Sequence, residues 1–183
     1  MVLKLRSFSL AALAVGLAPA AWSQLVVNAG VPAATVVQDI LVGEGVVITN
    51  ITFSGDADQI GTFDAANSNI LVPDGMIMAT GTASVAIGPN NIGSQTTGGG
   101  NFGAGDPDLQ AISTVAMNDA AILEFDFVPN GDSISFNYSF GSEEYNEYVC
   151  GTVNDAFGFF LSGPGISGPV SNGAINLAII PGP

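Results

Sequence analysis

The sequence predicts an all-β domain, namely an antiparallel β-sandwich of jelly-roll-like type with one short N-terminal helix and long Gly-rich loops. Short runs of alternating apolar and polar residues recur along the chain, which is typical of strands with one face in a core. Gly, Asn, Ser and Thr separate these runs, and the 183 residues include 24 Gly and 10 Pro. Frequent turn signals between short strands favour antiparallel sheets.

One helix is expected near the N-terminus, over residues 32–41. Pro32 suits its first position, and Gly43 suits its C-terminal stop. Its apolar residues share one face at helical spacing, namely Val36, Val37, Ile40 and Leu41.

The clearest strand patterns are residues 45–53 and residues 120–128. Residues 133–140 alternate as well, and the turn signal at residues 129–132 joins them to residues 120–128 as a hairpin. Residues 59–63 are expected to continue the 45–53 strand or to pair with it. Shorter strands are expected at residues 25–28, 157–161 and 174–180, and residues 70–72 lead through a turn at residues 73–75 into a buried strand at residues 76–79.

Two long loops and one short helix complete the expected fold. Residues 81–105 form a Gly-rich loop, and loops of this length are often functional. Residues 106–113 predict one or two helical turns. A Gly- and Pro-rich stretch at residues 162–173 separates the last two strands.

The N-terminus has the pattern of a secretory signal. Lys4 and Arg6 precede an apolar run, and residues 21–23 offer small side chains at −3 and −1. We expect cleavage after Ser23, with cleavage after Ala20 as the alternative. The apolar run is shorter than the about 20 residues of a membrane-spanning helix, so no transmembrane segment is expected after cleavage.

These features predict two segments, a signal peptide at residues 1–23 and a single domain at residues 24–183. Both basic residues of the chain lie in the signal, whereas all 16 Asp and Glu follow it. Without clustered Lys and Arg, the domain is not expected to bind nucleic acid. Without His it has neither a Ser-His-Asp triad nor a His metal ligand, and Cys150 has no partner for an internal disulfide.

Carboxylates without basic partners must be solvated, bound to backbone amides, placed at helix N-termini or neutralised by cations. The densest acidic cluster, with Asp155 just after it, predicts a calcium site. Asp126 is added because it shares a strand face with Glu124, where like charges repel unless the face is solvated or holds a cation. Ca²⁺ takes about 6 to 8 oxygen ligands, and carboxylates supply them. The alternative is a solvated acidic loop. The expected metal ligands are Glu143, Glu144, Glu147, Asp155 and Asp126.

Two further acidic loops are second candidates, one with Asp56 and Asp58 and one with Asp106 and Asp108. The favoured interpretation of Asp106 is a cap on the helix that follows it. Tyr145 and Tyr148, beside the main cluster, are expected to wall a site or to stack on a sugar.

Six stretches of the sequence together resemble the bacterial choice-of-anchor L domain family, over essentially the whole chain after the signal. They are residues 42–46 running into 50–55, then 105–109, 119–129, 140–148, 154–165 and 176–182. The resemblance implies a β-rich domain of a secreted or cell-surface protein, without an assigned catalytic activity. Because the chain stops at Pro183, where such domains usually continue, we expect an incomplete C-terminus and an anchor beyond it.

The expected function is that of a non-enzymatic surface module that adheres to, or binds, an extracellular glycan or protein. Two alternatives stay open. Glu143 and Glu147 are a carboxylate pair of the kind that glycosidases use, which would make the chain a carbohydrate-active hydrolase. The domain could also be a purely structural spacer in a larger surface protein.

Overall fold

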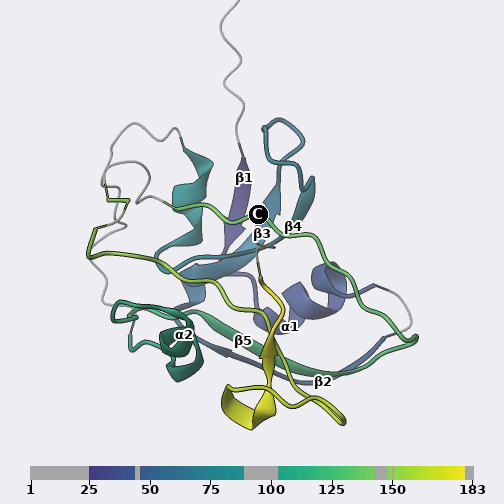
Figure 1. Ribbon diagram of the computed structural model, residues 1–183. Coiled ribbons are helices and arrows are strands. Elements are labelled where there is room, and N and C mark those ends of the chain that lie inside the picture. The colour runs from purple at the N-terminus through teal and green to yellow at the C-terminus, as the bar shows by residue number, and fades with distance from the viewer. Residues whose placement is uncertain (1–24, 44–45, 89–102, 143–147, 150, 180–183) are drawn as a thin grey trace, which may run out of the picture.

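The computed structural model describes residues 25–43, 46–88, 103–142, 148–149 and 151–179 (Figure 1). Most of its regular structure is antiparallel β, which confirms the all-β class, while the jelly-roll-like sandwich stays a prediction. The strands are β1 Val26–Ala29, β2 Val47–Ser54, β3 Ile60–Asp64, β4 Asp74–Met78, β5 Ile122–Val128, β6 Phe160–Leu161 and β7 Ile175–Asn176. The helical segments are α1 Ala33–Thr35, η1 Val36–Leu41, η2 Ala57–Gln59, η3 Ala83–Ile87, α2 Pro107–Ile112 and η4 Ser171–Gly173.

The first sheet has the order β1-β3-β4, with both pairs antiparallel. Gly61 in β3 lies opposite Ala29, and a Cβ there would collide with the backbone oxygen of Asn28. A residue without a side chain is therefore needed where β1 and β3 approach each other. The sheet differs from the prediction, because β3 neither continues β2 nor pairs with it.

The second sheet pairs β2 with β5. Its register shifts between Thr49 and Thr52, and Asn50 at this bulge has φ of 54°. Asn tolerates this left-handed conformation better than most residues. The bulge lets the Asn50 amide donate a hydrogen bond to the Asp126 carboxylate of β5, at 2.6 Å.

The helix predicted at residues 32–41 is present as α1 continued by the π-helical η1. Val36 and Val37 are fully buried; α1 contacts β2, and η1 contacts β3 and β4. Ile40, expected on the same face, is instead exposed. The reason is the wider turn: the Val42 amide bonds to the Val37 carbonyl, five residues back, which rotates the end of the helix.

The predicted hairpin of residues 120–128 with residues 133–140 is wrong. β5 pairs with β2, and residues 133–140 contain no strand. A smaller correction concerns the strand predicted at residues 76–79. β4 begins at Asp74, inside the expected turn, because its pairing with β3 extends to Asp64.

The last two strands are shorter than the predicted residues 157–161 and 174–180. Their ladder has only two residue pairs, Phe160 with Asn176 and Leu161 with Ile175. The short helix α2 lies inside the predicted residues 106–113, as expected. Of the long Gly-rich loop, residues 83–87 form η3, whereas residues 89–102 lie outside the described residues.

Candidate functional site

The predicted calcium ligands fall in three places. Glu143, Glu144 and Glu147 lie outside the described residues, so their arrangement stays a prediction. Asp155 is half-buried in the segment that leads to β6. Asp126 is exposed on the outer face of β5, where its carboxylate binds Asn50. Within the described part of the chain, no three acidic side chains come close enough to share a metal ion.

The two other acidic loops have structural roles. The Asp56 side chain caps η2 by accepting from the Asp58 amide, and its own amide donates to the Gln59 side chain in a capping box. The Asp106 carboxylate caps α2 by accepting from the Asp108 and Leu109 amides, both at 2.9 Å. The cap predicted for Asp106 is therefore confirmed.

Asp108 ties α2 to the C-terminal part of the chain. Its carboxylate accepts from both the amide and the hydroxyl of Ser171, at 3.0 and 2.9 Å. This carboxylate thus has protein donors, as Asp56, Asp106 and Asp126 do. The described acids that the sequence singled out serve mainly to satisfy backbone and side-chain donors.

The side chain of Gln59, directly before β3, makes three hydrogen bonds. It is fully buried, and its amide nitrogen donates to the carbonyls of Thr80 and Asp119 at 3.0 and 2.9 Å. Its side-chain oxygen accepts from the Asp56 amide at 2.7 Å. One side chain thus joins three separate segments, a role that sequence patterns did not reveal.

Asp119, whose carbonyl accepts from Gln59, has both an unusual backbone conformation and an unpaired side-chain oxygen. It has φ of 54°, and its Oδ1 is buried without a hydrogen-bond partner. Because a left-handed backbone and an unpaired buried carboxylate oxygen both cost free energy, this residue strains the domain.

Four rings form an aromatic patch that the sequence analysis did not identify: Phe136, Tyr138, Phe157 and Phe159. Phe136 stacks on Phe159 with ring centroids 4.1 Å apart, and Tyr138 lies 5.4 Å from Phe157. Phe136, Tyr138 and Phe157 nevertheless remain 37, 45 and 40 % exposed. The alternation of residues 134–140 was the available signal, but it was assigned to a hairpin core.

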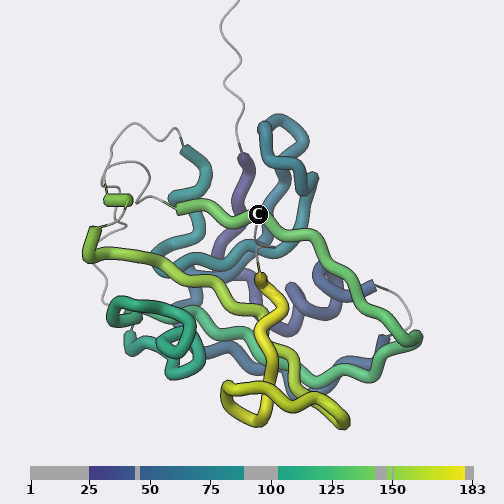
Figure 2. Tube along the Cα trace, viewed as in Figure 1, coloured from purple at the N-terminus to yellow at the C-terminus, as the bar shows by residue number. Residues whose placement is uncertain are grey.

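Further apolar side chains of the same two segments are exposed. Ile134 and Phe140, on the same alternation as Phe136, are 45 and 53 % exposed, and Val153 is also exposed. In Figure 2, residues 129–142 and residues 151–159 run as long traces across the front of the molecule. Exposed apolar patches of this kind mark interaction surfaces more often than isolated exposed residues do.

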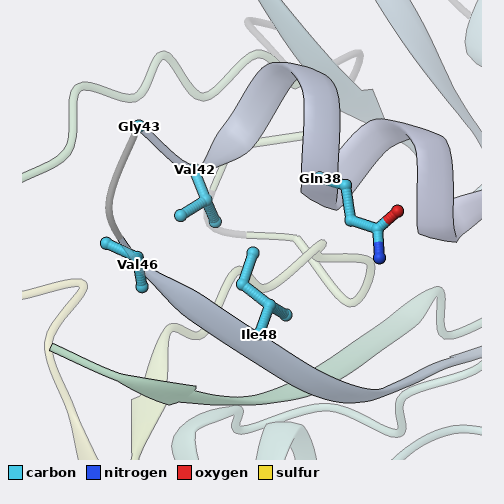
Figure 3. Close-up of a pocket in the computed structure, with 5 residues that line it drawn as sticks. All are labelled: Gln38, Val42, Gly43, Val46 and Ile48. Carbon is cyan, nitrogen blue, oxygen red and sulfur yellow. The ribbon is translucent and has the colours of Figure 1, made fainter.

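A small hollow lies between the end of η1 and the start of β2. Figure 3 shows the side chains of Val42, Val46 and Ile48 lining it, with Gln38 and Gly43. Its volume of about 230 Å³ is below the about 300 Å³ of typical ligand pockets, and none of the described residues that line it is acidic. We therefore assign it no function.

Fold and surface together define a small β-rich module with an exposed aromatic patch. Residues 26–183 match the Choice-of-anchor L domain, and the chain belongs to this family. It is therefore an extracellular module of a secreted or cell-surface bacterial protein. Neither curated proteins nor solved structures gave a significant match. Among the helices that the structure describes, none has the length and apolarity to cross a membrane.

Proposed function

We propose that this chain is a surface module that binds a macromolecular ligand and catalyses no reaction. The aromatic patch supports this role, because three of its rings stay more than a third exposed although they contact one another. Monomeric soluble proteins rarely leave large apolar side chains exposed together unless the patch binds something. Adhesion to an extracellular glycan or protein is the proposed activity.

The experiment compares binding by the secreted chain and by patch variants. The chain is applied to an array of glycans and to immobilised extracellular proteins. Tyr138→Ser and Phe157→Ser should each weaken binding by about tenfold or more, because exposed aromatic rings often dominate binding free energy. Leu71→Ser is the matched control, since Leu71 is 98 % exposed and lies between β3 and β4, a segment that contributes none of the four rings. Equal loss in the control would contradict the proposal.

The absence of catalysis is part of the proposal. The structural roles of Asp56, Asp106 and Asp108 support it, because capping carboxylates are poorly placed to transfer protons to a substrate. A screen of glycosidase substrates tests it, with Glu143→Gln and Glu147→Gln as variants. Turnover that either variant abolishes would establish the hydrolase alternative instead.

Calcium is the proposed stabilising ion. All 16 carboxylates follow residue 24, where the chain has no basic side chain, so their mutual repulsion is relieved only by solvent, hydrogen bonds or cations. A site with Glu144 and Asp155 would respond to Ca²⁺ beyond general screening. At about 100 times the dissociation constant, binding adds about 2.7 kcal/mol to the free energy of unfolding.

The calcium proposal is tested by thermal unfolding in Ca²⁺, in Mg²⁺ and in NaCl of matched ionic strength. Ca²⁺ should raise the melting temperature by about 5 to 10 °C, and Mg²⁺ should do less because it demands stricter octahedral geometry. Glu144→Gln should remove the difference, whereas Asp74→Asn, at the exposed start of β4, should not. Equal stabilisation by NaCl would leave only a solvated acidic surface.

A further inference from the structure

Residues 133–141 form an extended run that has no backbone partner among the described residues (Figure 1). Every one of them is exposed, and within the described part of the chain none makes a backbone hydrogen bond. An extended segment with free N–H and C=O groups is a template on which another strand can pair. β5, which directly precedes it, has its backbone paired with β2.

Along one edge of residues 133–141, aromatic side chains contact residues 157–159. Phe136 contacts Phe159, and Tyr138 contacts Phe157. Moving two residues towards the C-terminus on one segment therefore corresponds to moving two residues towards the N-terminus on the other. This is the register of antiparallel neighbours in a sheet, made here by rings alone. Phe159 is anchored in turn, because its carbonyl accepts from the Leu177 amide at 2.7 Å next to the β6–β7 pair. The opposite edge of residues 133–141 has no neighbour in the described chain that bonds to it.

The chemistry of the open run indicates its partner. Residues 133–141 carry no charge, and their apolar side chains alternate with Ser and Asn. The chain around them is strongly acidic and has no basic residue after Arg6, so a second copy would be repelled. A sugar would leave the row of amides unpaired and would find one face of Phe136 already covered by Phe159. A neutral or basic polypeptide strand satisfies both requirements.

We propose that residues 133–141 bind an extended, neutral or basic polypeptide by strand addition, at the edge turned away from Phe157 and Phe159. Main-chain hydrogen bonds supply affinity in this mode, and alternate side chains supply specificity. The partner's apolar side chains would lie beside Ile134, Phe136 and Tyr138. This inference rests on the proposed binding function and names the class of ligand.

The test uses the secreted chain and a synthetic peptide as long as the segment, in which Val and Lys alternate. Binding is followed by fluorescence anisotropy of the labelled peptide, and hydrogen exchange locates the contact. The peptide should bind and should slow amide exchange at residues 133–141. Two peptides of the same charge, each N-methylated at one alternate set of amides, separate strand pairing from attraction by charge. One of them should bind at least about tenfold more weakly, because it has lost the donors of one edge.

Protein variants make the same distinction. Successive N–H groups of a strand point to opposite edges, so one of Asn137→Pro and Tyr138→Pro should abolish peptide binding. For Tyr138→Pro the loss must exceed that of Tyr138→Ser, which removes the ring but keeps the amide. Binding that neither proline weakens, or that both N-methylated peptides retain in full, would overturn strand addition. Self-association that protects residues 133–141 without peptide would identify a second copy as the occupant and overturn the choice of partner. Glycan binding without peptide binding would overturn this inference but leave the binding function intact.

Discussion

Two consecutive stretches of this chain have the same alternating pattern and different structures. β5 pairs with β2 from Ile122 to Val128 across one bulge, whereas residues 133–141 are extended and have no backbone partner in the described chain. In β5 the alternation places Phe125 and Phe127 inward and leaves Asp126 outside. In residues 133–141 every side chain is exposed. Alternation therefore determines which side chains share a face, but a strand also needs a backbone partner to complete it.

The largest expected effect is that of proline scanned singly along both stretches. In β5, substitutions that remove a ladder hydrogen bond should lower the free energy of unfolding by about 2 to 4 kcal/mol. At the polar positions of this run, namely Ser133, Ser135, Asn137 and Ser139, each proline should cost less than about 1 kcal/mol, because it removes neither a ring contact nor a backbone hydrogen bond to the described chain. Chemical denaturation measures both series. Equal costs in the two stretches would show that residues 133–141 are paired after all.

The next effect concerns the polar junction in the well-bonded N-terminal region. Gln59→Leu should cost about 2 to 4 kcal/mol, because it leaves the Asp56 amide and the Thr80 and Asp119 carbonyls without their partner. Gln110→Leu is the matched control. Gln110 also makes two side-chain bonds to backbone, but at the surface, so its loss should cost less than about 1 kcal/mol. Similar costs would mean that Gln59 is not buried in solution.

A smaller effect is expected where rings alone connect two segments. A double-mutant cycle with Phe136→Ala and Phe159→Ala should give a coupling free energy of about 0.5 to 1.5 kcal/mol, the usual range for an aromatic pair. The same cycle with Phe136→Ala and Phe127→Ala should give a coupling near zero, since no contact joins those rings. Denaturation curves supply all the values. A coupling near zero for the first pair would remove the link between residues 133–141 and β6.

The smallest expected effect is an increase, not a decrease, in the free energy of unfolding. Asp119→Asn should stabilise the domain by about 0.5 to 1 kcal/mol, because it removes the charge from an oxygen that is buried without a partner. Asn also tolerates the left-handed backbone of this position. Asp132→Asn, at an exposed position, is the control and should change little. Destabilisation by Asp119→Asn would indicate that the carboxylate binds something that keeps it charged.

Local sequence patterns predicted the helix and the helix cap correctly. They failed to predict strand pairing, because segments far apart in the sequence compete for the same partner. Pro32 and the spacing of Val36 and Val37 predicted the helix, and Asp106 predicted the cap of α2, because each depends on neighbours within a few residues. The hairpin failed because β5 pairs with β2, which lies far away in the sequence. No local signal distinguishes that partner from the adjacent residues 133–140.

The candidate site was predicted in part only. Composition indicated that carboxylates must find partners other than Lys and Arg, and Asp126 and Asp108 do so through Asn50 and Ser171. Which donor each would find depends on the bulge in β2 and on the path of the C-terminal segment, which composition does not encode. The aromatic patch was missed for the same reason, since its rings come from two segments whose contact is tertiary.

Hydrogen exchange of the free secreted chain tests the difference between β5 and residues 133–141 most directly. Amides of β5 that bond to β2 should exchange more slowly than in an unstructured peptide by a factor on the order of a thousand. Their hydrogen bonds break only when the sheet unfolds. Amides of residues 133–141 should exchange within about tenfold of the unstructured rate, since none is hydrogen-bonded to another described residue. Protection of residues 133–141 as strong as that of β5 would contradict the open strand and the binding mode derived from it.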